Sequence, residues 1–119
     1  MKISIVIPAY NESGTISELL NLVKQTPMPL FEKEIIVVND ASTDGTKDIL
    51  EKYQKDNEDV IVLHHEKNKG KGAALRTGFA RATGEFVVVQ DADLEYDPAD
   101  IYRMAAYAVE HCAPIVYGS

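Results

Sequence analysis

Two carboxylates separated by one residue, Asp91 and Asp93, follow an apolar run at residues 86–89 that is typical of a buried strand. In an extended chain, residues two apart project to the same side, so both side chains can face one site. Adjacent carboxylates repel each other unless a positive charge lies between them. Hard cations such as Mg²⁺ and Mn²⁺ prefer these oxygen ligands, which makes the pair a candidate metal site. The alternative is that the two acids only cap a helix or occupy a turn.

The segment Pro8-Ala9-Tyr10-Asn11-Glu12 follows the first apolar run and offers an aromatic ring between polar neighbours. It lacks the clustered glycines of a dinucleotide-binding or P-loop fingerprint, so it does not match a phosphate cradle. An aromatic ring with polar neighbours suits a nucleobase and a ribose. The alternative for Tyr10 is an ordinary amphipathic surface residue.

Two further acids, Asp40 and Asp44, lie in a turn rich in Ser, Thr and Gly after the second apolar run. Asp is common in such turns because its side chain binds backbone N–H groups, and we expect Asp44 to cap the following helix in this way. Asp40 comes directly after the strand. It is therefore the better candidate for accepting an N–H group of a base.

The densest positive patch consists of Lys67, Lys69 and Lys71, which alternate with Asn68, Gly70 and Gly72 at the start of a helix. Backbone amides, the helix dipole and the lysines could together meet a diphosphate. The alternative is a solvated, basic start of a helix with no ligand.

Apolar runs and helical periodicity alternate along the whole chain. We expect strands at residues 2–7, 34–38, 60–63, 86–89 and 114–117, with a helix between each strand and the next. This alternation predicts a three-layer α/β/α domain with a mostly parallel, Rossmann-like sheet. In this architecture ligands bind outside the carboxyl ends of the strands, which is where the loops that hold Tyr10, Asp40 and Asp91 lie.

The helices carry more local signals. Thr15 and Glu18 have the spacing of a capping box at the start of the first helix, and Pro98 suits the first turn of the last one. The residues expected on the core side of the second and third helices are Ile49, Leu50 and Tyr53, and then Ala74, Leu75, Phe79 and Ala82.

At 119 residues the chain has the size of one domain at most. The formal net charge of −7 argues against a nucleic-acid partner and fits a protein that recruits a metal ion to meet a polyanionic substrate. The single cysteine, Cys112, excludes an internal disulfide and a cysteine-based metal site. Neither an apolar run of about 18 residues nor a signal peptide is present, so we expect a cytoplasmic location.

Four motifs in this order resemble the family 2 glycosyltransferases of the GT-A fold: I-V-I-P-A-Y-N-E, V-V-N-D-A-S-T-D-G-T, N-K-G-K-G-A-A-L-R-T-G-F-A-R-A-T-G and Q-D-A-D-L-E-Y-D-P. They extend over nearly the whole chain, and four motifs in order are far more specific than one. With V-Y-G-S at residues 116–119, they are most similar to the branch of dolichol-phosphate mannosyltransferase and bacterial polyprenyl-phosphate glycosyltransferases.

The resemblance implies roles for individual residues. Pro8, Tyr10 and Glu12 match the loop around the nucleoside, Asp40 matches the acid that binds the base, and Lys71 matches a basic residue near the nucleotide. Asp91 and Asp93 match the catalytic D-x-D pair, and Glu95 would complete the coordination of Mg²⁺ or Mn²⁺. The implied nucleotide-binding set is Pro8, Tyr10, Glu12, Asp40, Lys71, Asp91 and Ala92, and the implied metal ligands are Asp91, Asp93 and Glu95.

The implied reaction is metal-dependent, inverting transfer of a sugar from a UDP- or GDP-sugar to an acceptor. The branch favours a polyprenyl or dolichyl phosphate acceptor, which would place the full-length protein at the inner face of a membrane. Family members carry the acceptor site after the last strand expected here. We therefore expect residues 1–119 to be the nucleotide-binding half of the domain and to be inactive alone.

The alternative is a nucleotide-sugar binding module without transferase activity, either on its own or completed by a partner or a second copy. An open sheet end after Tyr117 would expose an unpaired edge and so favour self-association. Two other α/β classes fit less well. A nucleotidyltransferase would need a glycine-rich, basic first loop, and a receiver domain would need several acids after its first strand and a Lys after its last.

Overall fold

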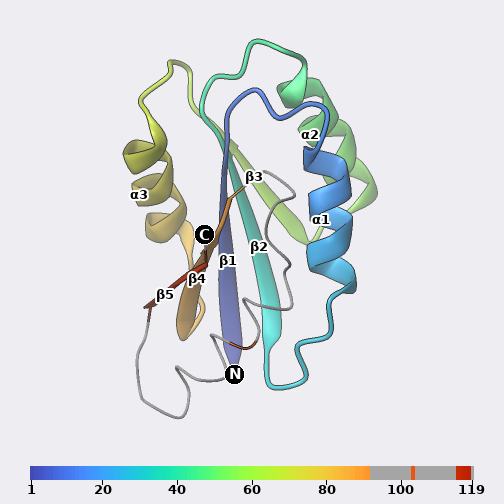
Figure 1. Cartoon of the computed structure of the whole chain (residues 1–119), viewed down its shortest axis with the longest axis vertical. Coiled ribbons are helices and arrows are strands. Elements are labelled where there is room, and N and C mark those ends of the chain that lie inside the picture. The colour runs from blue at the N-terminus through green and yellow to red at the C-terminus, as the bar shows by residue number, and fades with distance from the viewer. Residues whose placement is uncertain (92–102, 104–114, 119) are drawn as a thin grey trace.

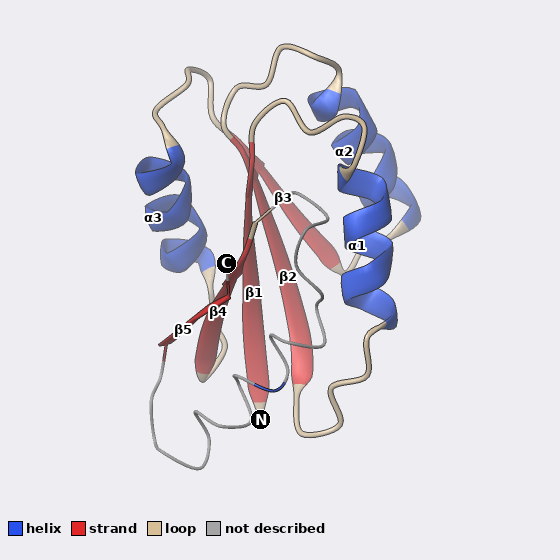
Figure 2. Cartoon of the chain, in the orientation of Figure 1, coloured by secondary structure: helices blue, strands red, loops and turns tan. Residues whose placement is uncertain are grey.

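The chain folds around a five-stranded sheet in which every described strand pairing is parallel. The structure, a computed structural model, describes residues 1–91, 103 and 115–118. The strand order is β3-β2-β1-β4-β5 (Figures 1 and 2). The strands are β1 (Lys2–Ala9), β2 (Glu32–Asn39), β3 (Val60–His64), β4 (Phe86–Gln90) and β5 (Ile115–Gly118).

Helices cover both faces of this sheet. α1 (Ile16–Gln25) and α2 (Thr46–Asp56) lie on one face, and α3 (Lys71–Arg81) lies on the other (Figure 1). The predicted three-layer α/β/α fold with a parallel sheet is confirmed. The helix expected after Pro98, together with Cys112, lies outside the described residues. Within the described part of the chain, no helix has the length and apolar character to cross a lipid bilayer.

The larger core lies between the sheet and the pair α1 and α2. Every second residue of β1 points into it, and the apolar stripe of α1 meets these side chains. β-branched residues dominate the strands because they pack well on a pleated surface that is buried on both sides. The fully buried members from β1 and α1 are Ile3, Ile5, Ile7, Ile16, Leu19, Leu20 and Val23.

The second face is different because α3 approaches the sheet through small residues. Ala74 and Gly78, one helical turn apart, are its buried positions. A Cβ atom built on Gly78 would lie 2.3 Å from Cγ1 of Val6, so only glycine allows this approach. The predicted core face of α3 is therefore partly wrong. Phe79 is 38% exposed, and Leu75 is half-buried.

The predicted capping box at the start of α1 is also wrong, because Thr15 makes no side-chain hydrogen bond that caps this helix. Its hydroxyl donates to Oε2 of Glu12 over 3.1 Å instead. A nearby carboxylate therefore competes successfully for the hydroxyl. In α2, Leu50 and Tyr53 are buried as expected, whereas Ile49 is half-buried.

A buried carboxylate fixes the amino-terminal end of the sheet. Glu34 on β2 accepts hydrogen bonds from the Ser4 hydroxyl at 2.7 Å and from the Thr83 backbone N–H at 2.9 Å and hydroxyl at 2.8 Å. Lys2 Nζ lies 3.2 Å from Oε2 of Glu34, the oxygen that also accepts the Thr83 hydroxyl. Burial alone would raise the pKa of Glu34, but these hydrogen bonds outweigh it and lower the pKa to about 2.

We expect Glu34→Gln to reduce the free energy of unfolding by about 1–3 kcal/mol at pH 7, because the amide leaves the donors around it poorly paired. The folded-state pKa lies below the ordinary value of 4.5, so this stability is present above pH 4.5 and is lost as the pH falls toward 2. Denaturant unfolding across this range should show the difference between wild type and variant shrinking. Glu32→Gln, at an exposed position of the same strand, is the control. A difference that stayed constant from pH 7 to pH 2.5 would contradict the assignment.

Candidate functional site

The strand order creates a topological switch point between β1 and β4. From β1 the chain runs to β2 on one side, and it later returns to β4 on the other side. Crevices outside the carboxyl ends of strands at such a point are the usual ligand sites of open parallel sheets. The loops that follow β1, β2 and β3 gather at this end of the sheet (Figure 2).

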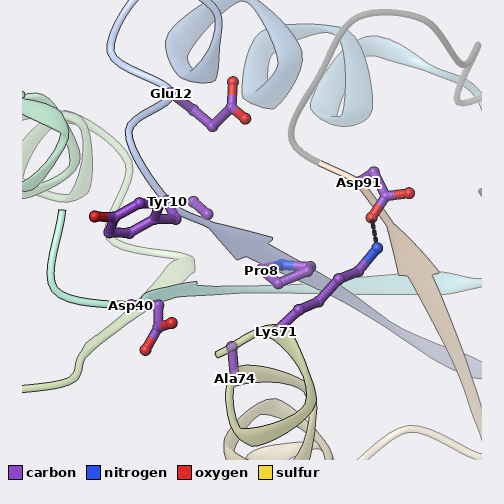
Figure 3. A pocket seen from close by; sticks show the side chains of 8 residues that line it. Pro8, Tyr10, Glu12, Asp40, Lys71, Ala74 and Asp91 are labelled. Carbon is purple, nitrogen blue, oxygen red and sulfur yellow. Dashed lines mark ion pairs between the residues drawn. The ribbon is translucent and has the colours of Figure 1, made fainter. Parts of the chain in front are cut away.

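A cavity of about 300 Å³ opens at the switch point. Its walls come from three strand ends and from the first turns of α3 (Figure 3). The residues that line it are Pro8, Ala9, Tyr10, Glu12, Asp40, Lys71, Ala74 and Asp91.

Strand register explains why residues so far apart in sequence meet here. Val6 pairs with Val89, and Pro8 pairs with Val38. Asp91 and Asp40 each come two residues after one of these partners. Because side chains alternate across a sheet, both acids project to the face that α3 covers.

Every predicted nucleotide-binding residue that the structure describes lines this one cavity. Ala92, Asp93 and Glu95 lie outside the described residues. The cavity also includes Ala9 and Ala74, neither of which the sequence assigned to a ligand, Ala74 being expected only on the core side of α3. The juxtaposition is an observation, while the role of each residue toward a ligand remains a prediction. The residues brought together as predicted are Pro8, Tyr10, Glu12, Asp40, Lys71 and Asp91.

Asp40 is held more tightly than the sequence indicated. Its side chain is only 5% exposed. Its carboxylate accepts hydrogen bonds from the N–H groups of Lys69 at 2.9 Å and Gly70 at 2.8 Å, and from the ring of His65 at 2.8 Å. Burial raises the pKa of this carboxyl, but the donors from Lys69, His65 and Gly70 outweigh that effect, so the pKa is lowered. Asp40 is therefore an ionised acceptor that also anchors the segment before α3.

Sequence reasoning missed His65. It directly follows β3, as Asp91 directly follows β4, so the rule that sites lie at the carboxyl ends of strands could have found it. No short motif marks it, however, because its partner Asp40 lies 25 residues away in sequence.

The loop after β1 is fastened to the loop after β2 by hydrogen bonds. The Asn11 N–H donates to the Ser42 hydroxyl at 3.0 Å, and the Thr43 N–H donates to the Asn11 side chain at 2.8 Å. Asn11 has a φ of 53°, a left-handed conformation that asparagine tolerates well. The loop that carries Tyr10 and Glu12 is thus fixed before any ligand arrives.

The N-cap residue of α2 is Gly45 rather than Asp44, but the Asp44 carboxylate does bind the start of the helix, because it accepts the Thr46 N–H at 3.1 Å. It also accepts the Thr46 hydroxyl, and its second oxygen accepts the Ser13 N–H at 3.1 Å. These bonds, chiefly the one from the Thr46 hydroxyl, lower the pKa of Asp44 to about 2. Asp44 therefore joins the start of α2 to the loop after β1.

Of the three lysines Lys67, Lys69 and Lys71, only Lys71, the first residue of α3, lines the cavity. Its Nζ lies 2.6 Å from Oδ1 of Asp91, and this ion pair spans the cavity from α3 to the end of β4 (Figure 3). Lys67 and Lys69 are exposed. The arrangement places one cation and one carboxylate beside the amino-terminal end of α3, where an anionic ligand is favoured.

The described residues contain no group of three His, Cys, Asp or Glu side chains that could hold a metal ion. Asp91 is the one proposed ligand within the described residues, and its carboxylate oxygens are the donors that Mg²⁺ and Mn²⁺ prefer. It lies at the cavity, 19% exposed, where such an ion could reach it. The donor chemistry at this position therefore fits the proposed metal.

An open parallel sheet with a polar cavity at its switch point defines an α/β domain of the nucleotide-binding type. The model of the family "Glycosyl transferase family 2" matches residues 4–119. The chain belongs to this family of glycosyltransferases and has the GT-A fold. A curated relative, the poly(ribitol-phosphate) beta-glucosyltransferase of Bacillus spizizenii, is 38% identical over 119 residues, which are 99% of this chain and 19% of the relative.

Solved structures resemble the chain over most of its length. S. aureus TarS 1-349 in complex with UDP-GlcNAc has a TM-score of 0.76 and 37% identity over 94% of this chain and 32% of that one. The mannosyltransferase PcManGT from Pyrobaculum calidifontis, in complex with GDP-Man and Mn²⁺, has a TM-score of 0.76 and 28% identity over 90% of this chain and 32% of that one. The chain thus spans about a third of these structures.

Lys71→Met is expected to weaken binding of UDP about tenfold and to leave binding of uridine unchanged, because the lost cation would meet only the diphosphate. Calorimetric titration with the two ligands measures both affinities. Lys69→Met, which removes an exposed lysine outside the cavity lining, is the matched control and should change neither. Equal weakening of UDP and uridine by Lys71→Met would contradict a contact with the diphosphate.

Proposed function

We propose that this domain binds the donor of a metal-dependent, inverting glycosyl transfer, a UDP- or GDP-linked sugar. The observation that carries the proposal is the cavity at the switch point, which collects Tyr10, Asp40, Lys71 and Asp91 from four separate segments. Membership of glycosyl transferase family 2 supports the reaction class. Complexes of similar proteins with UDP-GlcNAc and with GDP-Man support the donor class.

Each of these residues would contact a different part of the donor. Tyr10, 46% exposed at the rim, offers its ring to the nucleoside, and Asp40 offers a carboxylate oxygen to a base N–H. Lys71 and the start of α3 provide positive charge for the diphosphate. Asp91 faces the ribose or the metal, so the reacting sugar would lie near the end of β4.

Asp91, Asp93 and Glu95 would hold the Mg²⁺ or Mn²⁺ ion. When bound, such an ion acts as a Lewis acid that stabilises the charge growing on the departing nucleoside diphosphate. Two similar enzymes were solved with Mn²⁺, namely PcManGT and the glucosyl-3-phosphoglycerate synthase of Mycobacterium tuberculosis, the latter at 26% identity. Lys71 would have to release Asp91 for the ion to bind both aspartates, because it lies directly on that carboxylate.

For the acceptor we propose polyprenyl phosphate, on the resemblance of the four motifs to that branch. A phosphate oxygen is already anionic and needs little help from a general base, and this acceptor would place the reaction at the inner face of a membrane. The 38% identity to a poly(ribitol-phosphate) beta-glucosyltransferase favours a second candidate, a hydroxyl of a ribitol phosphate polymer. A hydroxyl acceptor would require a general base, normally a carboxylate.

We further propose that residues 1–119 supply donor binding and that the acceptor is bound by other residues of the protein. The chain spans 19% of the curated relative and about a third of the similar structures, which supports this division. A binding module that acts without catalysing transfer is the alternative proposal, and a transfer assay separates the two.

Binding of UDP or GDP should require Mg²⁺ or Mn²⁺, and Asp93→Ala should abolish this metal dependence. The reason is that a bound ion would offset the negative charge of the carboxylates, which would otherwise repel the diphosphate. Calorimetry with metal and then with chelator measures the effect. Asp56→Ala, at the exposed end of α2, is the control and should keep the metal dependence. Equal affinity of the wild-type protein for the nucleotide with metal and with chelator would contradict the proposal.

Labelled sugar should pass from a nucleotide sugar to polyprenyl phosphate when the full-length protein is present, and no label should pass when residues 1–119 act alone. The measurement uses UDP-glucose, UDP-GlcNAc and GDP-mannose in turn, with polyprenyl phosphate or poly(ribitol phosphate) as acceptor. Label on poly(ribitol phosphate) alone would establish the second candidate acceptor. Donor binding without transfer to either acceptor would support the binding module, and turnover by residues 1–119 would overturn the proposed division.

A further inference from the structure

His65 joins the cavity to the middle of α3. Its Nδ1 lies 2.8 Å from Oδ1 of Asp40, and its Nε2 lies 2.8 Å from the hydroxyl of Thr77. The side chain is 8% exposed, so these contacts are largely shielded from water. The proposed function uses Asp40 but gives His65 no role.

Hydrogen-bonding chemistry fixes which atom donates between His65 and Asp40. The ionised carboxylate of Asp40 can only accept, so Nδ1 of His65 must carry the hydrogen between them. In the neutral ring Nε2 is then an acceptor, and the Thr77 hydroxyl donates to it. The ring is thereby held at both nitrogens, and it can neither turn nor exchange its two nitrogens without losing a bond.

This arrangement determines which part of Asp40 remains available to a ligand. Oδ1 receives two donors, the His65 ring and the Lys69 N–H, whereas Oδ2 receives the Gly70 N–H alone among the described residues. A carboxylate oxygen has two accepting positions, so Oδ2 keeps one, and Asp40 lines the cavity. An acceptor fixed in this position favours a base with a ring N–H, such as uracil or guanine, and disfavours cytosine and adenine, whose corresponding ring nitrogens are acceptors.

We propose that His65 is a positioning residue that orients the Asp40 carboxylate and thereby sets the preference of the site for bases that carry a ring N–H. The inference rests on the proposed function, because it takes the ligand to be a nucleoside diphosphate sugar. His65 touches Asp40 rather than the ligand. Its loss should therefore reduce discrimination between bases more than it reduces overall binding.

Two substitutions at His65 distinguish the contributions of the two ring nitrogens. The amide nitrogen of Asn can take the place of Nδ1, so His65→Asn should keep the donor to Asp40 while losing the bond to Thr77. The longer Gln places its amide near Nε2, so His65→Gln should keep a polar group near Thr77 while losing the donor to Asp40. A merely structural role for His65 predicts no such division.

The measurement is the ratio of affinities for UDP over CDP, and for GDP over ADP, by calorimetry in the full-length protein with Mn²⁺ present. We expect the ratio of UDP over CDP, and that of GDP over ADP, to fall about tenfold in His65→Gln. The fall should be only about threefold in His65→Asn, which keeps the donor to Asp40 and loses only the bond to Thr77. Thr77→Val, which removes only the outer anchor of the ring, should lower the ratio about threefold. His64→Gln is the matched control, because His64 contacts Asn39 rather than Asp40, and it should leave the ratio unchanged.

Thermal unfolding checks that each variant is folded. If His65→Gln does not fold, Thr77→Val still tests the positioning role. An unchanged ratio in folded His65→Gln, or equal losses in His65→Gln and His65→Asn, would overturn the positioning role while leaving the proposed function intact. A wild-type protein that binds UDP and CDP alike, and GDP and ADP alike, would overturn the role of Asp40 in base choice and this inference with it. A wild-type protein that binds none of the four would overturn the proposed function itself.

Discussion

Two buried carboxylates hold α3 against the sheet, one at each end of β2. Asp40, directly after β2, binds the N–H groups of Lys69 and Gly70 immediately before the helix. Glu34, near the start of β2, binds Thr83 just after the helix. A buried charge without such partners costs several kcal/mol, so the position of α3 is set by the need to supply donors to both acids. The location of Lys71 in the cavity follows from this constraint.

The backbone before α3 adopts a conformation that brings its N–H groups to Asp40. Gly70 has a φ of 90°, a conformation that L side chains rarely adopt, and its N–H lies 2.8 Å from Asp40. Further along, Gly78 lets the helix approach Val6 more closely than any side chain would allow. Close packing in the middle of the helix and hydrogen bonding at its ends therefore act together, and they leave a cavity at the carboxyl end of the sheet rather than a filled core.

The fold could be predicted because its signals are local. Apolar runs located the strands and helices, and the general rule for parallel sheets placed Tyr10, Asp40 and Asp91 at one end. Packing distance is not local, so the periodicity of α3 assigned Phe79 to the core when the helix in fact lies too close to the sheet for a large side chain there. The capping box predicted at Thr15 is wrong for a related reason, because the Thr15 hydroxyl donates to the carboxylate of Glu12, three residues earlier.

The site was predictable as a set of residues but not as a set of interactions. Asp40 has the same sequence signature whether its carboxylate is left open to a ligand or anchors a loop. Here it anchors a loop, through partners 25 to 30 residues away in the sequence. Lys71 and Asp91 were assigned to opposite partners, a diphosphate and a metal, yet they neutralise each other over 2.6 Å. The carboxylate and the ammonium form an ion pair without any ligand. A ligand of this site therefore has to offer each of them a better partner. A diphosphate that arrives with a divalent cation supplies one opposite charge for each, which neither a neutral sugar nor a free anion can do.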